Sequence, residues 1–327
     1  MIVDCHVHAV TDTPEHGRLS RRVRTSLTFR FIRWRLGLRN RAGEPFEREA
    51  EALLLRTIEE SDHLDAAVVL AFDAAHDGEG NFDRANTHLH VSNDHVADLA
   101  ARHPKVLFGA SIHPYRKDAV AELERCLARG AVLLKWLPIV QNFNPADARC
   151  FPLYEALAHH RLPLLSHTGG EQALPNVNPH VKDPMLLVPA LQRGVRVIAA
   201  HCGTRDRPAE PCYLSAFVRL AREYEHFYGD TAALNLPMRS YAFDTILRDD
   251  VVRRKLVHGS DWPIFCVPTR RVGWLRALRL LFGEKNWMSR DVLTKQRLGL
   301  DDAYWHRAAT LLRLPGGSRS DRGRSTS

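Results

Sequence analysis

The chain opens with Met1-Ile-Val-Asp-Cys-His-Val-His8, an apolar strand pattern that ends in two histidines. Side chains at positions i and i+2 of a strand share a face, so Asp4, His6 and His8 are expected to point the same way. Two imidazoles on one face can hold one metal ion, and Asp4 can orient one of the rings from behind it. An isolated His-x-His can equally be two surface residues, so other segments of the chain are needed to distinguish a metal site from a surface pair.

Four later segments repeat this pattern, because each is an apolar run that closes on a residue able to bind a metal. They are Leu133-Leu-Lys135, Leu164-Leu-Ser-His167, Ile198-Ala-Ala-His201 and His258-Gly-Ser-Asp261. Imidazole and carboxylate groups are ligands that divalent ions prefer, and a strand end can aim such a ligand rigidly. Five strand ends of this kind predict a metalloenzyme and count against the surface alternative.

Strand and helix patterns alternate along the chain. Strands are expected over residues 2–6, 65–72, 106–113, 131–137, 162–167, 195–201, 227–230 and 256–260, with helices over 46–64, 86–102, 118–130, 152–160, 184–192, 209–224 and 238–248. Near-continuous apolar strands, each followed by a helix, indicate parallel strands covered on both faces. Eight such units predict an α/β fold, a (β/α)8 TIM-type barrel whose active site lies at the carboxyl ends of the strands. An open doubly wound sheet would need a glycine-rich turn where His6-Val-His8 stands.

Composition is that of an ordinary soluble globular protein, with 327 residues, 45% of them apolar and 26% charged. The six cysteines include no Cys-x-x-Cys pair, so a disulfide framework is not expected and a reducing, cytoplasmic compartment fits. We expect no transmembrane segment, because no apolar run approaches the roughly 20 residues that span a bilayer. The first residues enter a strand pattern without a basic stretch, which argues against a signal peptide.

The formal net charge of +8 belongs to one segment. Residues 18–41 hold nine arginines and no acidic residue, whereas outside them 37 basic residues stand against 38 acidic ones. We therefore expect one domain over residues 1–314 that carries residues 18–41 as a basic insertion after strand 1. Residues 315–327 are poor in apolar residues and are expected to be a disordered tail.

The insertion has apolar residues on two helical stripes, one formed by Leu27, Phe31, Trp34 and Leu38, the other by Phe29, Ile32 and Leu36. A helix with two such stripes is expected to pack on two sides. Three interpretations stay open: a lid whose arginines bind a carboxylate or phosphate substrate, an interface in a homo-oligomer, or a membrane-surface or nucleic-acid patch. Deletion of residues 18–41 would separate the lid from the interface.

From Ile2 to about Leu314 the chain resembles the amidohydrolase superfamily, and specifically its amidohydrolase-2 branch of metal-dependent hydrolases. The motifs that carry the resemblance are Asp4-Cys-His-Val-His8, Gly130-Ala-Val-Leu-Leu-Lys-Trp-Leu-Pro138, Ser166-His-Thr-Gly-Gly170, Ala200-His-Cys-Gly203 and His258-Gly-Ser-Asp-Trp-Pro263. The resemblance implies that His6, His8, His167 and Asp261 hold a first divalent metal, with zinc expected. It implies that His201 either holds a second metal or acts as an acid/base.

Lys135 separates the two mechanisms that the resemblance allows. In binuclear members of the superfamily a lysine in this strand is carboxylated, and the carbamate bridges two metals. In mononuclear decarboxylase-like relatives Lys135 would stay an ammonium and pair with an anionic substrate. The expected activity is hydrolysis of a small molecule with Asp261 as proton acceptor, and the alternative is a one-metal decarboxylase or hydratase. Nucleic acid is a poorer candidate substrate, because the TatD-like nucleases typically carry glutamate in place of Lys135.

Three further residues are candidates for substrate binding. His113 closes the third strand, where a structural histidine is an equal alternative. Thr168 and Glu171 follow a proposed ligand across two glycines that permit close approach of a small molecule, although a loop carboxylate is more often solvated. His88, His90 and His95 lie on a helical pattern and are predicted to face solvent.

Overall fold

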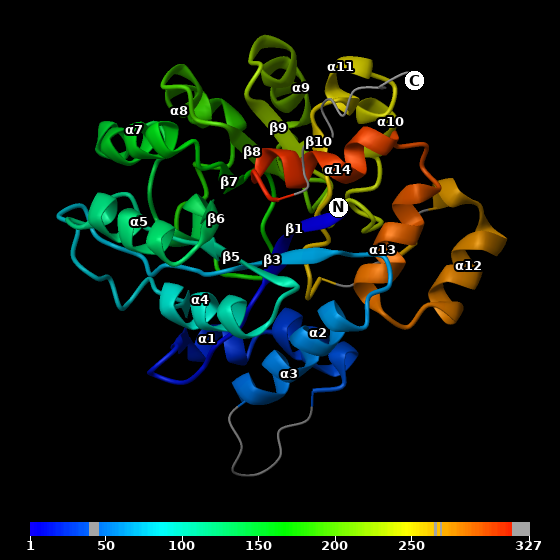
Figure 1. The fold of residues 1–327 in the computed structure, drawn as a ribbon, viewed down its shortest axis with the longest axis horizontal. Helices are drawn as coiled ribbons and strands as arrows, with labels where there is room; N and C mark the ends of the chain where they lie inside the picture. The colour runs from blue at the N-terminus through cyan, green and yellow to red at the C-terminus, as the bar shows by residue number, and fades with distance from the viewer. Residues whose placement is uncertain (39–45, 265–266, 269, 316–327) are drawn as a thin grey trace, which may run out of the picture.

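The computed structural model describes residues 1–38, 46–264, 267–268 and 270–315. Eight parallel strands form one curled sheet in chain order (Figure 1): β1 (Val3–His8), β3 (Ala66–Leu70), β5 (Val106–Ala110), β6 (Ala131–Trp136), β7 (Leu164–His167), β8 (Val197–Ala200), β9 (Phe227–Asp230) and β10 (Leu256–Val257). The sheet closes on itself, because Cys5 N–H donates to the His258 carbonyl (3.0 Å) and Asp261 N–H donates to the His6 carbonyl (2.9 Å). The predicted (β/α)8 barrel is confirmed.

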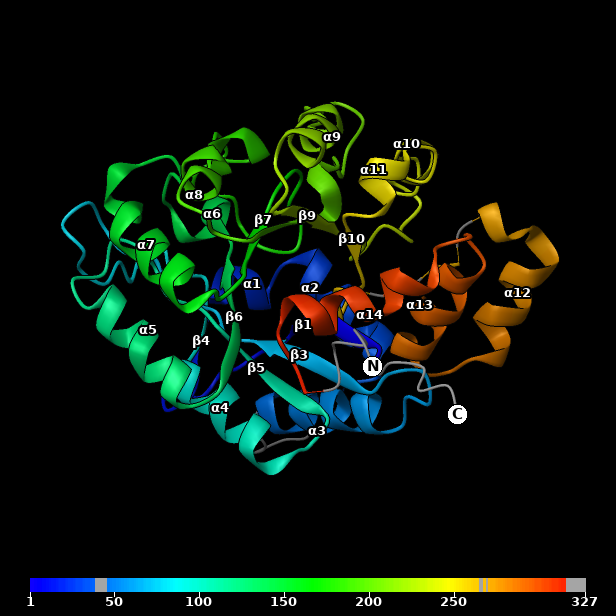
Figure 2. The ribbon, with the colours of Figure 1, turned by 45° about the horizontal axis from the view of Figure 1, so that its top comes forward.

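Helices surround the sheet (Figure 2), and most of them bury one face, although α12 has no buried residue. The outer helices are α3 (Phe46–Glu59), α4 (Asn93–Arg102), α5 (Ala119–Ala128), α7 (Phe151–His160), α8 (Val188–Gln192), α9 (Leu214–Glu223), α10 (Ala242–Ile246), α11 (Asp250–Arg253), α12 (Trp274–Gly283) and α13 (Trp287–Gln296). In α9 the buried residues are Leu214, Phe217, Leu220 and Ala221, which is the spacing of a single helical face. Burial of such faces against the strands fixes the barrel.

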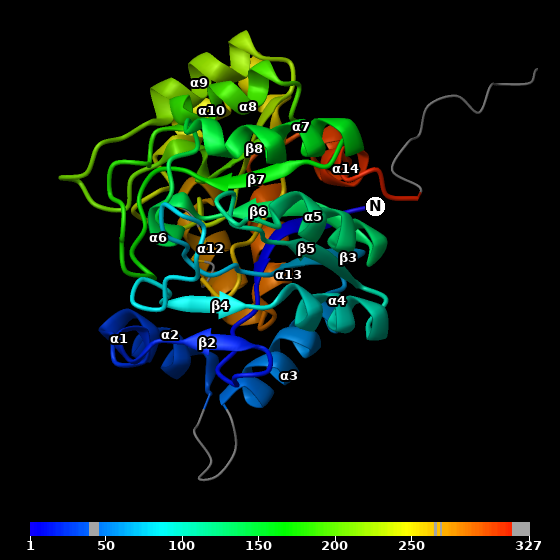
Figure 3. The same cartoon turned by 90° about the vertical axis from the view of Figure 1, so that its left-hand side faces the viewer.

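One end of the barrel is closed by α14 (Asp302–Leu311). Ala308 and Leu311 of this helix pack against Val3 and Cys5, which point into the barrel from β1. Figure 3 places α14 and the N-terminus at one end of the molecule and the insertion helices at the opposite end. The carboxyl ends of the strands therefore open toward the insertion.

The insertion contains a strand and two helices: β2 (Gly17–Leu19), α1 (Arg21–Arg24) and α2 (Leu27–Leu36). The hydroxyls of Ser20 and Ser26 cap α1 and α2, by accepting hydrogen bonds from the N–H groups of Val23 and Phe29. Glu47 in α3 holds the start of the insertion, because its Oε2 accepts from the N–H groups of Asp12 (2.9 Å) and Thr13 (3.0 Å). The insertion is thus anchored to the barrel at its base.

The helix predicted over residues 86–102 begins only at Asn93. Leu89–Val91 form β4 instead, because they pair antiparallel with β2 of the insertion. The predicted solvent exposure of the nearby histidines was wrong: His88 and His95 are buried, and His90 is half-buried. A pairing between segments about 70 residues apart cannot be read from local periodicity.

Expectations from the sequence also concern the cysteines, membrane-spanning segments and the C-terminal tail. Cys5, Cys126, Cys150, Cys202 and Cys212 are all free thiols, in line with the expected absence of a disulfide framework. No helix within the described residues is long and apolar enough to cross a bilayer. The predicted disorder of the tail concerns residues that, after Pro315, lie outside the described part of the chain.

Candidate metal centre

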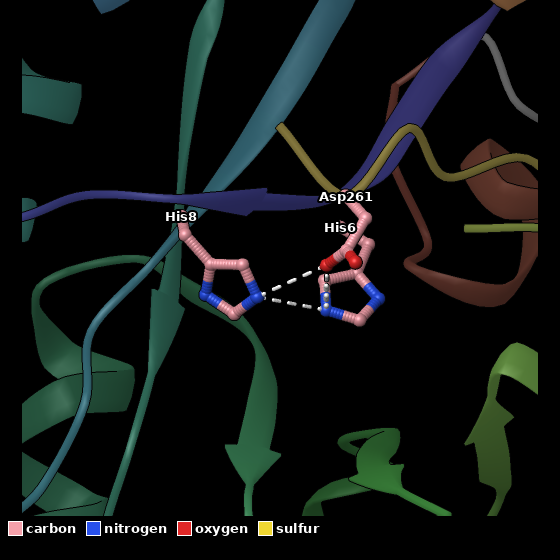
Figure 4. Close-up of side chains that lie close together, drawn as sticks. All are labelled: His6, His8 and Asp261. Carbon is pink, nitrogen blue, oxygen red and sulfur yellow. Dashed lines mark hydrogen bonds and ion pairs between the residues drawn. The ribbon is translucent and has the colours of Figure 1, made fainter. Parts of the chain in front are cut away.

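Three predicted ligands converge at the carboxyl end of β1 (Figure 4). The Nε2 atoms of His6 and His8 lie 3.1 Å apart, and each lies 3.3 Å from Oδ1 of Asp261. His6 and His8 come from β1, while Asp261 comes from the loop that follows β10 and closes the barrel. The closure of the barrel therefore assembles the triad from the two ends of the sheet.

The triad fits a divalent metal ion. Ligands at about 2.0–2.2 Å from one ion lie roughly 3.0–3.5 Å from one another in tetrahedral or octahedral arrangements, which matches the distances in the triad. Burial lowers the pKa of His6 well below its ordinary value, so its imidazole is neutral, as a ligand must be. The chemistry and the spacing of these donors both suit the ion that the sequence predicts.

Asp230, at the end of β9, orients two of the histidines. Its Oδ2 accepts a hydrogen bond from His6 Nδ1 (2.7 Å), so the proton of the ring lies on Nδ1 and the lone pair of Nε2 faces the triad. Its Oδ1 accepts from the N–H groups of His201 (2.7 Å) and Ala232 (3.1 Å). Carboxylate partners of this kind fix the tautomer and the ring orientation of metal ligands.

His167 and His201 lie beside this triad. Their ring centroids are 5.0 Å apart, and the His201 ring is 5.2 Å from that of His6. His201 Nδ1 donates to the Ala232 carbonyl (2.9 Å) and His167 Nε2 to the Gly170 carbonyl (3.1 Å), so each ring keeps one nitrogen for another partner. Among the described residues, His167 does not belong to a group of three mutually close donor atoms.

Lys135 reaches the centre from β6. Its side chain is buried, and Nζ donates to Nε2 of His6 at 2.9 Å. Burial lowers the pKa of Lys135 to about 8. Burial is the main cause of the lowered pKa values of His6, His167 and His201, and the positive charge of Lys135 lowers them further. Lys135 therefore acts on the histidines on both sides of the centre.

His201 and Asp261 have backbone conformations that side chains seldom adopt. Their φ angles are +59° and +66°, in the left-handed region. Such conformations cost free energy and persist where the surrounding structure imposes them, often at functional sites. At these two strand ends the turn aims each side chain into the barrel mouth.

A cavity of about 600 Å³ opens on the centre, and four of the predicted ligands line it: His8, His167, His201 and Asp261. Glu171 also lines it, with Oε2 3.9 Å from His167 Nδ1, and burial raises the pKa of Glu171 to about 7. These side chains place the centre on the wall of a cavity that a small molecule can enter and fill.

His113 and Thr168 lie outside this cavity, unlike Glu171. The ring of His113 is buried, with Nε2 donating to the Gln141 carbonyl (2.9 Å) and Nδ1 accepting from Tyr115 N–H (3.1 Å). The Thr168 hydroxyl donates to the Ala200 carbonyl (2.7 Å) and so ties β7 to β8. In this structure both side chains contact neighbouring residues outside the cavity, and their binding of substrate stays a prediction.

Sequence reasoning missed two residues of the site and misplaced a third. Asp230 ends an apolar strand just as the predicted ligands do, so the same pattern contained it. Arg239 lines the cavity from the segment before α10, and its Nη2 donates to the Gly170 carbonyl (2.8 Å); no pattern in the sequence indicated it. Asp4 was expected to orient a ring, but its Oδ1 accepts from the N–H groups of His6 and Ser260 and helps to close the barrel.

Solved structures with the same fold are similar to this chain along nearly their whole length. They include an uncharacterized TIM-barrel protein from Bordetella bronchiseptica (17% identity, TM-score 0.60, 95% of this chain and 99% of that one). A probable 2-pyrone-4,6-dicarboxylic acid hydrolase from Acinetobacter baumannii, solved with citric acid, has 13% identity and a TM-score of 0.55 (96% and 99%). A dihydroxybenzoic acid decarboxylase from Polaromonas, solved with manganese and 2-nitroresorcinol, has 18% identity and a TM-score of 0.53 (95% and 96%).

No curated protein sequence matches this chain significantly. The family model for amidohydrolases of the amidohydrolase-2 type, however, matches residues 3–296. The match includes the predicted ligands on every strand end, from His6 to Asp261. The protein belongs to the amidohydrolase-2 family of metal-dependent enzymes.

Proposed function

We propose that this protein is a metal-dependent hydrolase that acts on a polar bond of a small molecule, with two divalent ions bridged by carboxylated Lys135. His6, His8 and Asp261 would hold one ion, with zinc as the expected metal. His167 and His201 would hold the other. The resemblance assigned His167 to the first ion, but its place beside His201 favours the second.

The observation that carries this proposal is the position of Lys135. Its amine lies 2.9 Å from a donor atom of the triad, and its charge acts on His167 and His201 as well. A buried ammonium in contact with a ligand atom would repel a cation bound there. A carbamate would reverse that charge, and a pKa near 8 leaves part of the amine neutral and able to react with carbon dioxide.

When bound, such ions would act as Lewis acids and lower the pKa of a water molecule to about 7. Asp261 would be the residue placed to accept a proton from an attacking water and to return it to the leaving group. Asp230 keeps His6 and the His201 backbone in place. Arg239 also lines the cavity and would attract an anionic group on the substrate.

The second candidate function is that of a one-metal decarboxylase or hydratase. A pKa of about 8 keeps most of the Lys135 amine protonated at neutral pH wherever carbon dioxide does not capture it. An ammonium at this position would pair with a substrate carboxylate, and His201 would then act as the acid/base. The free buried thiols suit a reducing compartment, so we place either activity in the cytoplasm.

The two candidates differ in the product that they release. Zinc-loaded protein is assayed against a panel of lactones, esters and amides for acid release, and against aromatic carboxylic acids for carbon dioxide release. We expect hydrolysis, which Asp261→Asn should reduce by about a hundredfold or more. Asp250→Asn, an exposed change on α11, serves as the control. Release of carbon dioxide without hydrolysis of any compound would overturn the proposal.

A further inference from the structure

The cavity extends well beyond the residues that would hold the metal. Its volume of about 600 Å³ lies in the range of sites for drug-sized ligands, roughly 300–1,000 Å³. Helix α2 lines it with Phe29, Ile32 and Leu36, and helix α3 with Phe46 and Leu54. The part of the cavity next to these helices, here called the apolar chamber, has a wall made mainly of hydrocarbon.

Helix α2 borders the chamber without filling it. None of its residues is fully buried, although Phe29, Ile32 and Leu36 form an apolar stripe that faces the chamber. The opposite face carries Leu27, which is 81% exposed. A capped helix that presents an apolar stripe to a cavity, without burying it against other protein groups, is typical of the wall of a ligand-binding groove.

The polar groups in this wall are engaged with their neighbours. His95 Nε2 lies 3.3 Å from Glu51 Oε2, so these two side chains bind each other across α4 and α3. The guanidinium carbon of Arg33 lies 5.0 Å from the centroid of the Phe46 ring, a cation–π distance. The chamber therefore offers a ligand mainly apolar contact, in contrast to the charged metal centre at the other part of the same cavity.

We infer that the substrate is amphiphilic: its reacting polar group lies at the metal centre, and a hydrocarbon group occupies the apolar chamber beneath α2. This inference rests on the proposed function, because it gives the substrate class of the same site. It also assigns a role to the insertion, whose inner stripe would form the specificity wall for the hydrocarbon group. Substrates that lack this group would bind only through the metal centre.

Straight-chain hydroxamic acids test the inference, because the hydroxamate binds zinc and the chain reports on the chamber. Dissociation constants for the zinc-loaded protein are measured by calorimetry from acetohydroxamate to decanohydroxamate, with the matching alcohols as compounds without a zinc-binding group. We expect each added methylene to tighten binding by about fourfold until the chamber is filled, which corresponds to about 0.8 kcal/mol per buried methylene.

Variants of α2 show whether the gain in affinity with chain length comes from the apolar chamber. Ile32→Asp places a carboxylate on the chamber wall and should abolish the gain with chain length. Leu27→Asp makes the same kind of change on the exposed face of the same helix and should preserve the gain. Ile32→Trp fills part of the chamber and should shorten the chain at which affinity stops rising, which keeps the test decisive if Ile32→Asp does not fold.

The outcomes distinguish this inference from the proposed function. If acetohydroxamate binds but longer chains bind no tighter, the inference is wrong and the metal centre stands. If the hydroxamates bind no better than the alcohols, the metal centre is wrong, and the chain-length dependence of the alcohols alone then supports or refutes the chamber. An equal loss of chain-length dependence in Ile32→Asp and Leu27→Asp would also overturn the inference.

Discussion

At the scale of single residues, Asp230 matters because it acts on the centre without being a predicted ligand. It accepts hydrogen bonds from His6 Nδ1 and from His201 N–H. We expect Asp230→Asn to weaken zinc binding by about 10- to 100-fold, the usual cost of losing such a partner, because His6 would lose the charge that orients it. Competition titration with a zinc chelator measures this change.

The control for this prediction is Asp250→Asn, since the Asp250 side chain is 72% exposed and lies on α11. It removes the same charge from the protein at an exposed position that contacts none of the proposed ligands. Zinc affinity in Asp230→Asn equal to that of the wild type would show that His6 is oriented by other contacts.

The interaction of Glu51 with His95 predicts how the free energy of unfolding depends on pH. The hydrogen bond from His95 lowers the pKa of Glu51 below its ordinary 4.5; Arg102 adds to this shift and Glu47 opposes it. A carboxyl with a lowered folded pKa stabilises the fold above the unfolded value and loses that contribution as pH falls through the folded value. We therefore expect Glu51→Gln to lower the free energy of unfolding by about 1 kcal/mol at neutral pH. Urea denaturation should show the difference shrinking below pH 4.5; a difference that stays constant there would contradict the account.

The ligands predicted at the strand ends share one physical property. His6, His167, His201 and Asp261 each end an apolar run, and the end of a barrel strand is where the fold exposes a side chain to the mouth. Arg239 could not be predicted in this way, because it lies in an irregular segment whose course is set by packing. The Thr168 hydroxyl faces the Ala200 carbonyl and not the cavity, because adjacency in sequence to a predicted ligand does not decide which side of a turn a hydroxyl faces.

At the scale of elements, the strands were predictable and the insertion only in part. The two apolar stripes of the insertion predicted that its helix packs on two sides. In the structure the stripe with Phe29, Ile32 and Leu36 faces the cavity. The other stripe is divided, because Phe31 and Leu38 also line the cavity while Leu27 and Trp34 are exposed. Periodicity identifies an apolar face, but a face toward a core, a cavity or a partner has the same pattern in sequence.

The stability of α2 depends on its caps because it has no buried residue. Ser26 Oγ accepts a hydrogen bond from Phe29 N–H at 3.1 Å. We expect Ser26→Ala to destabilise the helix by about 1 kcal/mol, which corresponds to roughly fivefold faster hydrogen exchange of its amides. Hydrogen exchange read by mass spectrometry checks this, with Ser215→Ala on α9 as the control. Unchanged exchange in α2 would mean that contacts with the barrel hold the helix without its cap.

At the scale of the whole molecule, the centre joins the first strand to the loop after the last. His6 and His8 precede Asp261 by more than 250 residues, so an ion bound by all three would hold the barrel closed. A ligand that binds only the folded state at 100 times its dissociation constant adds about 2.7 kcal/mol of stability. We expect removal of the metal by a chelator to lower the melting temperature by roughly 5 °C and readdition to restore it.

A double variant, His6→Ala with His8→Ala, is the control for that melting experiment. Its melting temperature should not respond to chelator or to added zinc. A response as large as that of the wild type would place the stabilising ion elsewhere in the protein.

The most direct test of the central claim is the metal content of the protein together with the state of Lys135. Protein purified with zinc and isotope-labelled bicarbonate is analysed for metal per chain and, by carbon NMR, for a lysine carbamate. The account predicts two ions per chain and one carbamate, which Lys135→Ala removes. One ion per chain with no carbamate in the wild type would contradict it and favour the one-metal alternative.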